Sequence, residues 1–490
     1  MSLPTLEHLF DPEQFRANGH ALVELLAEQL ALSLHGKNGL MKWQPPQAAE
    51  QAWQQTMPET PELDSAGLIE WIKQEVLPRN LNMYHPHSMA HQAAPPLPVT
   101  VLSELVAAFS NQAMATYETG PAATLMERQL IRWLNALVGW PEGSGVLTSG
   151  GSQANLTALL VARQQVENSI WAKGISAGSR LRILTSTLSH YSIRRAAGIM
   201  GLGADAVISV AVDEQGRMCM RALQEAYEQC KAHNEQVMAV VATAGCTATG
   251  SIDPLREIGE YCRAHDLWLH IDAAHGASIL LSNQHREKLH GMALADSLSW
   301  DGHKLSFMPA TVSAVLFRED QASYRAFSQD ASYLFHEEDD MAELSFHTSY
   351  RTLECTKRMM ALKWLAAFKL YGRQGMAALV EHVFSLAEQF AGLLAQTAGF
   401  TLLMPPQTNI VCFRYLGDPA IRWDTASLNT LQTNIRQQLL HQELFHVSQV
   451  DIDNNTWLRC VIMNPYTDHS HQEELLKAVA TIGESLINHG

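Results

Sequence analysis

The chain has 490 residues, too many for one compact core, and 47% of them are apolar, so two or three packed domains are expected. The net charge of −16 offers no basic surface for phosphates, which argues against nucleic-acid binding. No apolar run approaches the roughly 18 residues of a membrane helix, and the first residues lack the pattern of a secretory signal. Seven scattered cysteines without a CxxC pair favour free thiols and a cytoplasmic location.

Residues 1–85 are predicted to form a helical segment that packs in a dimer. Leucines recur there at helical spacing, at positions 22, 25, 26, 30 and 32. Such a stripe can also pack on the chain's own core, which remains the alternative. Prolines at positions 45, 46, 58 and 61 interrupt the pattern, so several helices joined by loops are expected.

Residues 86–375 alternate predicted strands and helices and are expected to form the large domain. Asp253 is expected to cap one helix, with Pro254 in its first turn. The alternation predicts an α/β fold with a mainly parallel sheet, in which ligands bind beyond the carboxyl ends of the strands. The expected strands are 146–148, 182–185, 237–243, 267–272, 297–300 and 311–317, and the expected helices are 153–163 and 254–265.

Residues 376–490 are predicted to form a smaller C-terminal α/β domain. A long helix is expected from about 355 to about 397, with its Met and aromatic side chains in the core. Strands are expected near 410–413 and 457–461.

Three short motifs of the large domain carry chemistry. Asp272 ends a buried strand, where a carboxylate requires a partner, although a salt bridge or a helix cap would also satisfy it. Lys304 lies 32 residues later; in a pocket its amine can react with an aldehyde, whereas on a surface it is a solvated charge. The turn Ser149-Gly-Gly-Ser152 precedes a helix, where free amides can bind phosphate, although many turns look similar.

Together the motifs meet the needs of pyridoxal 5′-phosphate: a lysine for its aldehyde, a carboxylate for its pyridine nitrogen and a turn for its phosphate. His190 would add a flat ring that stacks on the cofactor. A second interpretation takes His270, Asp272 and His275 as metal ligands. No further histidine or acid at suitable spacing completes such a set, so we predict no metal.

The chain resembles the group II pyridoxal-phosphate amino-acid decarboxylases, whose members act on aromatic amino acids, glutamate, cysteine sulfinate or diaminobutyrate. The resemblance runs from about residue 85 to about residue 372. It rests on Ser149-Gly-Gly-Ser-Gln-Ala-Asn155, Ala242-Thr-Ala-Gly-Cys-Thr247, His270-Ile-Asp-Ala-Ala-His275 and Asp301-Gly-His-Lys304. It implies the type I aminotransferase-like fold and a homodimer with shared active sites.

The resemblance also implies roles for individual residues. Lys304 would bind the cofactor covalently, Asp272 would pair with the pyridine nitrogen, and His190 would stack on the ring. The remaining cofactor contacts would be Gly151, Ser152, Thr247, Ala274, Asp301 and His303.

Decarboxylation and transamination diverge only in which substrate bond is held perpendicular to the ring and where the proton returns. In the family, a tyrosine on a loop of the partner subunit protonates the substrate carbon, and Tyr333 in Ala331-Ser-Tyr-Leu-Phe-His336 matches it. An ordinary surface loop is the alternative. We therefore predict a carboxy-lyase, with a desulfurase or transaminase of the same fold as the alternative.

Two residues are predicted to bind the amino-acid substrate. Lys357 stands where many relatives carry a carboxylate-binding arginine, with Arg358 as the alternative anchor. His91 replaces the Gln of glutamate decarboxylases and resembles the His of diaminobutyrate-type enzymes. With the small residues Ala113 and Ala115, it favours a small polar or amino-bearing L-amino acid such as 2,4-diaminobutyrate; glutamate, aspartate and aromatic amino acids remain open.

Overall fold

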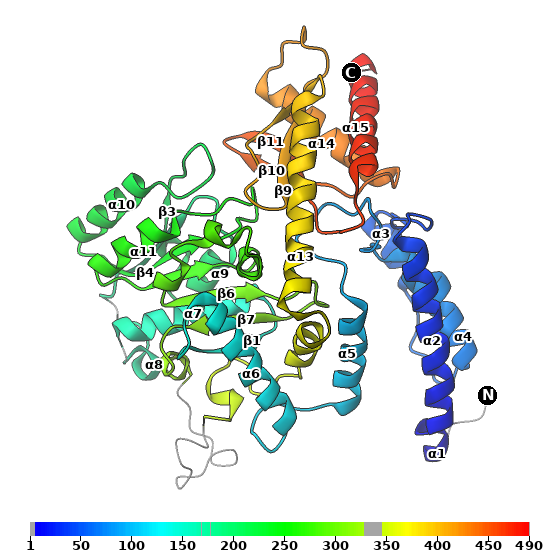
Figure 1. The fold of residues 1–490 in the computed structure, drawn as a ribbon, viewed down its shortest axis with the longest axis horizontal. Coiled ribbons are helices and arrows are strands. Elements are labelled where there is room, and N and C mark those ends of the chain that lie inside the picture. Colours follow the sequence, from blue (N-terminus) through cyan, green and yellow to red (C-terminus); the bar gives the residue numbers. More distant parts are fainter. Residues whose placement is uncertain (1–4, 168, 177, 328–344, 490) are drawn as a thin grey trace. The chain divides into compact units, whose positions relative to one another are not determined.

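The computed structural model describes residues 5–167, 169–176, 178–327 and 345–489. The chain divides into two compact units, and each is described by itself (Figure 1). The large unit comprises Gln92–Ala387 and Met404–Ile410. The small unit comprises Met1–His91, Glu388–Leu403 and Val411–Gly490.

The large unit is built on a seven-stranded sheet in the order β1-β7-β6-β5-β4-β2-β3. Neighbouring strands from β3 to β6 run parallel, and only β7 is antiparallel to its two neighbours, β1 and β6. The predicted mainly parallel α/β sheet is thereby confirmed. The strands are β1 (Ser144–Thr148), β2 (Leu181–Ser186), β3 (Val207–Val210), β4 (Gln236–Thr243), β5 (Leu269–Asp272), β6 (Ser297–Asp301) and β7 (Ser313–Phe317).

Helices cover this sheet, and α7 is the most central of them. It packs against β1, β4, β5, β6 and β7. The small side chains of Ala154, Ala158 and Ala162 are fully buried on it, which allows the helix to approach the sheet closely. The α-helices that lie wholly within the unit and are labelled in this order are α5 (Pro98–Ser110), α6 (Pro121–Val138), α7 (Gly151–Val166), α8 (Ile170–Lys173), α9 (Ser192–Ile199), α10 (Met220–Ala232) and α11 (Leu255–Ala264).

The predicted cap at Asp253 is wrong. Helix α11 begins at Leu255 without a side-chain cap. Asp253 instead accepts hydrogen bonds from the backbone amides of Met218, at 2.6 Å, and Thr243, at 2.7 Å. Burial raises the pKa of this carboxyl to about 6. It therefore fastens the segment before α10 to the end of β4, a tertiary role that local sequence does not indicate.

Strand β1 lies at the edge of the sheet, and buried polar side chains satisfy its outer backbone groups. Arg351 donates to Gly145 O at 3.3 Å, and Asn135 donates to Ser144 O at 3.1 Å. Glu127 accepts from Leu147 N at 3.1 Å, and Lys357 donates to Leu147 O at 3.0 Å. An open sheet edge is a template for aggregation, and here side chains close it.

The small unit contains a four-stranded sheet in the order β10-β11-β9-β8. The predicted strands near 410–413 and 457–461 are β9 and β11, whereas the shorter β8 and β10 were not predicted. Helix α14 packs against β10, β11 and α15. The elements are β8 (Phe400–Leu402), β9 (Ile410–Tyr415), β10 (Ser448–Ile452), β11 (Asn455–Val461), α14 (Thr425–His441) and α15 (His469–His489). The predicted long helix is α13 (Ala361–Gln396), which kinks at Gly372, where φ is 64°.

The N-terminal helices are α1 (Leu6–Leu9), α2 (Pro12–Ser33), α3 (Pro46–Trp53) and α4 (Ser65–Trp71). The predicted leucine stripe lies on α2, but within this chain only Leu25 of the stripe is buried, while Leu26 and Leu32 are about 40% exposed. Core packing of the stripe is thus only partial. None of the described helices is long and apolar enough to cross a membrane.

Candidate active site

The sheet register brings the ends of five strands of the large unit together. Thr243 at the end of β4 pairs with Asp272 at the end of β5, which pairs with Ser299 of β6. Through Ser313 of β7, Asp301 of β6 stands level with Thr148 of β1. The predicted carboxylate, lysine and phosphate turn all follow these strand ends, where parallel sheets bind ligands.

Lys304 lies beside a buried carboxylate at the end of β6. Its Nζ is 3.3 Å from Oδ2 of Asp301, and its side chain is 18% exposed. Ser313 donates a hydrogen bond to the other oxygen of Asp301. His303 Nε2 lies 3.6 Å from Asp301 Oδ2, while its Nδ1 is anchored 2.9 Å from Val312 O. The lysine amine is thus held by charge at the rim of a cavity instead of extending into solvent.

Asp272 is fixed by three donors. Asn155 donates to its Oδ2 at 2.9 Å, and Ser299 Oγ and the Ala274 amide donate to its Oδ1, each at 3.2 Å. Burial opposes ionisation, but the positive charge of Lys304, together with donors such as Asn155, holds the pKa of Asp272 below its usual value. The side chain is an ionised carboxylate at neutral pH.

A chain of hydrogen bonds supports Asp272 from behind. Both amide protons of Asn155 are used, on Asp272 and on Ser192 Oγ, so its Oδ1 must accept from His270 Nε2 at 3.0 Å. His270 Nδ1 then accepts from Ser297 Oγ, which itself accepts from Trp268. Burial lowers the pKa of His270 to about 4, which keeps the ring neutral in the single tautomer that this chain requires.

The predicted phosphate turn forms the N-terminus of α7. Gly150 precedes the helix with φ of 137°, a backbone conformation that favours glycine, and open space lies where its side chain would be. A side chain at Gly151 would meet Asp301 Oδ1 at 2.8 Å. The backbone conformation thus favours glycine at position 150, and the contact with Asp301 favours it at position 151. Both residues line the cavity at the start of α7, where a helix can bind an anion.

These groups line one cavity of about 380 Å³. All nine residues predicted to contact the cofactor line it: Gly151, Ser152, His190, Thr247, Asp272, Ala274, Asp301, His303 and Lys304. Its wall also includes Thr243, whose buried Oγ1 has no hydrogen-bond partner among the described residues. The cavity is thus polar: the Lys304 amine, the carboxylates of Asp272 and Asp301 and the Thr243 hydroxyl all belong to its wall.

His190 carries its ring at this cavity and is held by Ser192, whose Oγ lies 2.8 Å from its Nδ1. Burial lowers the pKa of His190, and Lys304 lowers it further, against the opposing effect of Asp272. The ring is therefore neutral at pH 7, as a ring that stacks on an electron-poor heterocycle should be.

The other predicted site residues lie elsewhere. Tyr333 falls outside the described residues. Lys357 does not line the cavity; it is buried in an ion pair with Glu127 at the β1 edge, and Arg358 pairs with Glu104 on the surface. A charge already neutralised inside the protein is poorly placed to bind a substrate carboxylate, so the geometry offers no support for Lys357 as the anchor.

His91 belongs to the small unit, where its ring lies 5.2 Å from that of His446. Burial lowers the pKa of His91, and the charges of Arg459 and Arg436 lower it further. The surroundings of His91 are therefore positive, which suits an anionic group. Sequence reasoning did not single out Arg436, Arg459 or His446.

Known proteins are similar to this chain in sequence and fold. Residues 46–416 match the pyridoxal-dependent decarboxylase conserved domain. The chain belongs to the pyridoxal-dependent decarboxylase family. It is 30% identical to the acidic amino acid decarboxylase GADL1 of Mus musculus, over 94% of this chain and 85% of that protein, and 31% identical to the L-2,4-diaminobutyrate decarboxylase of Acinetobacter baumannii, over 84% and 82%. The crystal structure of mouse CSAD superposes with a TM-score of 0.90 at 28% identity, covering 96% of this chain and 99% of that one.

The predictions of the family, the fold, pyridoxal 5′-phosphate and carboxy-lyase activity are thereby confirmed: this pyridoxal-dependent decarboxylase removes a carboxyl group from an amino acid. The cavity fits the cofactor, because the Lys304 amine, the Asp272 carboxylate and the N-terminus of α7 all line it and correspond to an aldehyde, a pyridine nitrogen and a phosphate. His270, Asp272 and His275, considered above as metal ligands, instead bind Asn155, Asn155 and Asn409 respectively.

Lys357→Met tests whether this lysine is structural. Removing one partner of a buried ion pair leaves Glu127 uncompensated, so we expect the free energy of unfolding to fall by about 3–5 kcal/mol. The folded enzyme should keep its KM. The double variant Glu127→Leu/Lys357→Met should recover part of the stability in chemical denaturation, because the uncompensated charge is gone but Leu147 N and O lose their partners. An unchanged stability with a strongly raised KM would instead restore the carboxylate-anchor prediction.

His270→Gln tests the chain behind Asp272 through pH. His270 has a folded pKa of about 4, below the ordinary 6.5, so folding favours the neutral ring. Its contribution to stability is complete above pH 6.5 and is lost as the pH falls toward 4. Between pH 7.5 and 5, the wild type should lose about 2 kcal/mol more than His270→Gln in urea unfolding. Equal losses would mean that His270 is not held neutral.

Proposed function

We propose the following roles for the cavity residues in decarboxylation. Lys304 holds the cofactor covalently through its amine, Asp272 keeps the pyridine nitrogen protonated, and His190 stacks on the ring. Gly151, Ser152 and His303 hold the phosphate, and Thr247, Ala274 and Asp301 complete the contacts. When bound, the cofactor supplies an electron-accepting ring for the electron pair released as carbon dioxide leaves. The observation that carries this proposal is the ionised, three-donor carboxylate of Asp272, which lines the same cavity as Lys304.

The protein residues also decide which product forms. Asp272, held in place by its donors, would keep the pyridine nitrogen of the cofactor protonated and positively charged. A proton donor placed at the substrate carbon would then complete the reaction. We assign that donor to Tyr333 of a partner subunit, on the basis of its sequence match. A phenol has an ordinary pKa near 10, so at pH 7 it carries a proton that it can donate to the substrate carbon.

We propose a small amino-bearing substrate, with L-2,4-diaminobutyrate as the first candidate, and His91 as one of its contacts. Support comes from the relative of that name and from the net charge of −16, which favours approach of a substrate with an extra amine. An acidic amino acid is the second candidate, favoured by the likeness to an acidic amino acid decarboxylase and by the positive surroundings of His91.

An amino-acid panel separates these candidates. We expect the kcat/KM for carbon dioxide release to be highest with L-2,4-diaminobutyrate. The compared substrates are ornithine, lysine, glutamate, aspartate, cysteine sulfinate and aromatic amino acids. Because approach of a cation to a negative protein is screened by salt, kcat/KM should fall as ionic strength rises. The highest kcat/KM for aspartate, glutamate or cysteine sulfinate, rising with salt, would replace the first candidate by the second.

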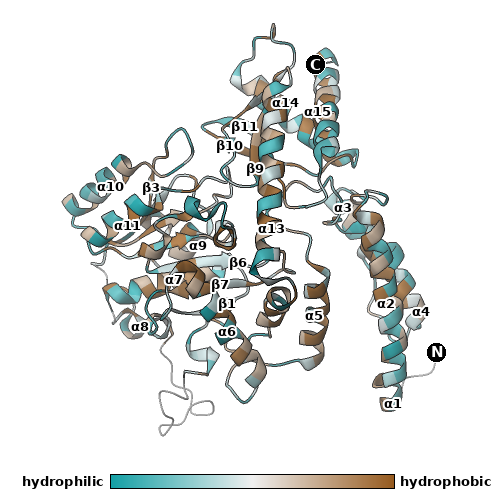
Figure 2. Ribbon diagram, viewed as in Figure 1, coloured by the Kyte–Doolittle hydropathy of each residue, from teal (hydrophilic) through white to brown (hydrophobic). Residues whose placement is uncertain are grey.

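We propose that the enzyme is a cytoplasmic homodimer with shared active sites, in which the helical segment 1–85 packs against the partner subunit. Residues 86–375 form the large cofactor-binding domain, and residues 376–490 form the small domain. Exposed apolar side chains support an interface on both units. On α5 they are Leu102, Leu105, Val106 and Phe109, at 51% to 76% exposed, and Figure 2 shows α5 apolar along its length. In the N-terminal helices they are Leu6, Leu9, Phe10 and Phe15, at 59% to 82% exposed. All seven cysteines are free, as suits a reducing compartment.

Mixing two inactive variants tests the shared site. Lys304→Ala removes the cofactor lysine and Tyr333→Phe removes the proton donor, so each homodimer should be impaired, the second with increased abortive transamination. If Tyr333 acts on the partner's lysine, a mixed dimer has one intact site, and a random mixture regains about a quarter of wild-type activity.

The readout is carbon dioxide release after the two variants are unfolded together and refolded, with light scattering to confirm dimers. Each variant refolded alone is the control. Activity no higher than the mean of the two controls would show that Tyr333 and Lys304 of one chain act together or that Tyr333 has no role.

A further inference from the structure

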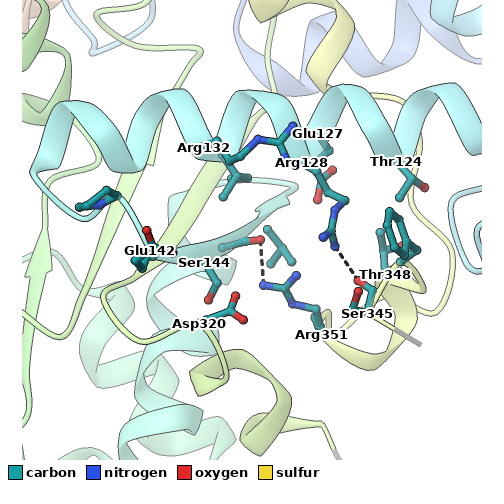
Figure 3. A pocket seen from close by; sticks show the side chains of 16 residues that line it. Thr124, Glu127, Arg128, Arg132, Glu142, Ser144, Asp320, Ser345, Thr348 and Arg351 are labelled. Atoms are coloured by element: carbon teal, nitrogen blue, oxygen red, sulfur yellow. Dashed lines mark hydrogen bonds between the residues drawn. The ribbon is translucent and has the colours of Figure 1, made fainter. Parts of the chain in front are cut away.

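One segment, residues 351–357, holds both strand β1 and the turn that follows it. Arg351 and Lys357 donate hydrogen bonds to carbonyl oxygens of β1, at 3.3 Å and 3.0 Å, and Figure 3 shows the bond from Arg351. Glu354 lies between them in the sequence and accepts a hydrogen bond from Ser149 Oγ at 2.6 Å. Because Ser149 directly follows the last residue of β1, the same segment also fastens the first residue of the predicted phosphate turn.

Glu354 differs from Arg351 and Lys357 in its burial and in the group that it binds. Arg351 and Lys357 are at most 8% exposed and bind backbone, so their loss would disturb the edge of the sheet itself. Glu354 is half-buried and binds a side-chain hydroxyl through Oε1, whereas its Oε2 has no hydrogen-bond partner among the described residues. Replacing Glu354 should therefore release the turn and leave the strand in place.

Ser149 has two hydrogen-bond donors, and other residues accept from both. Its amide donates to Gln153 Oε1 at 3.1 Å, and its hydroxyl donates to Glu354. Ser149 lines the cofactor cavity, but both of its protons are committed to these acceptors. An anion at the turn would therefore take its donors from the residues that follow, at the start of α7. Ser149 can serve such a site by placing the chain.

The bond between Ser149 and Glu354 restrains a part of the chain that is otherwise free to move. Ser149 is exposed, and the next residue, Gly150, has φ of 137°. Glycine loses more conformational freedom on ordering than any other residue. A hydrogen bond to a carboxylate is stronger than one between neutral groups, so it restrains the turn before a ligand arrives. A turn ordered in advance loses less entropy when it binds its ligand, which raises the affinity.

We propose that Glu354 is a positioning residue for the cofactor. Through the Ser149 hydroxyl it holds the turn in the conformation that binds the phosphate, although Glu354 itself does not line the cavity. This role rests on the phosphate position proposed above, at Gly151 and Ser152. Because Glu354 acts only through the turn, its effect is confined to ligands that carry a phosphate.

Two forms of the cofactor test this role: pyridoxal 5′-phosphate, and pyridoxal, which has the same ring and aldehyde but no phosphate. Each is titrated into the full-length chain, freed of cofactor, and binding is followed by absorbance. Glu354→Ala and Ser149→Ala should each weaken the binding of pyridoxal 5′-phosphate at least about five-fold, and leave the affinity for pyridoxal unchanged. The double variant should bind no more weakly than either single variant, since both remove the same bond.

Glu354→Gln is the conservative variant, because its amide oxygen can still accept from Ser149. Its affinity for pyridoxal 5′-phosphate should lie within about two-fold of the wild type. Glu381→Ala is the matched control: Glu381 is also half-buried and accepts from Ser282 Oγ at 2.6 Å, but neither residue lines the cavity. Its affinity should equal that of the wild type. If Glu354→Ala does not fold, Ser149→Ala decides, because it removes only one exposed hydroxyl.

Three results would overturn the role of Glu354: wild-type affinity for pyridoxal 5′-phosphate in Glu354→Ala, an equal loss of affinity for pyridoxal, or no recovery in Glu354→Gln. Ser152→Ala separates this failure from a failure of the proposed phosphate position. If Ser152→Ala loses the preference for the phosphate ester and Glu354→Ala keeps it, only the role of Glu354 is wrong. If Ser152→Ala keeps the full preference, the phosphate position is wrong, and the role of Glu354 with it.

Discussion

The interaction on which the active site depends is the hydrogen bond from Asn155 to the buried carboxylate of Asp272. An ionised group inside a protein must be matched by donors or charge, or it takes up a proton. Asn155 comes from α7, Asp272 from β5 and Ser299 from β6, so the donors arrive only when helix and sheet have packed. Behind them, His270, Ser297 and Trp268 fix the direction of each proton. The ionised state of Asp272 is therefore set by the fold of the large unit.

Sequence reasoning identified the parts of this site that lie in short motifs. Strand ends, the glycine turn and Lys304 could be predicted because each is a local pattern, and a parallel sheet gathers strand ends at one edge. The supporting groups could not be predicted in the same way. Asn155 and His270 both lie within recognised motifs, but the residues that they bind are far away in the chain. Asn155 is 117 residues from Asp272, and His270 is 115 residues from Asn155. Which atom a polar side chain binds at such separation follows from packing, and no periodicity of the sequence records it.

Two assignments show where local patterns mislead. Asp253 before Pro254 has the sequence of a helix start, yet two distant backbone amides satisfy it. Lys357 stands at a position associated with substrate binding, yet it lies in the interior with Glu127 and closes the edge of β1. In both cases, a charged side chain forms hydrogen bonds with backbone groups that would otherwise lack a partner. Burial of that backbone depends on the order of strands, and β1 becomes the edge only because β7 inserts between it and β6.

Strand β1 leads directly into the cofactor cavity of the large unit. Its carboxyl end continues into the turn at Gly150 and Gly151, which line that cavity. Arg351 donates to Gly145 O, while Glu127 and Lys357 bind the backbone of Leu147, so three charged side chains fix the strand that presents the turn. A short strand of five residues that is held at one edge by side chains alone is sensitive to those side chains. The position of the turn therefore depends on buried charged residues that do not themselves line the cofactor cavity.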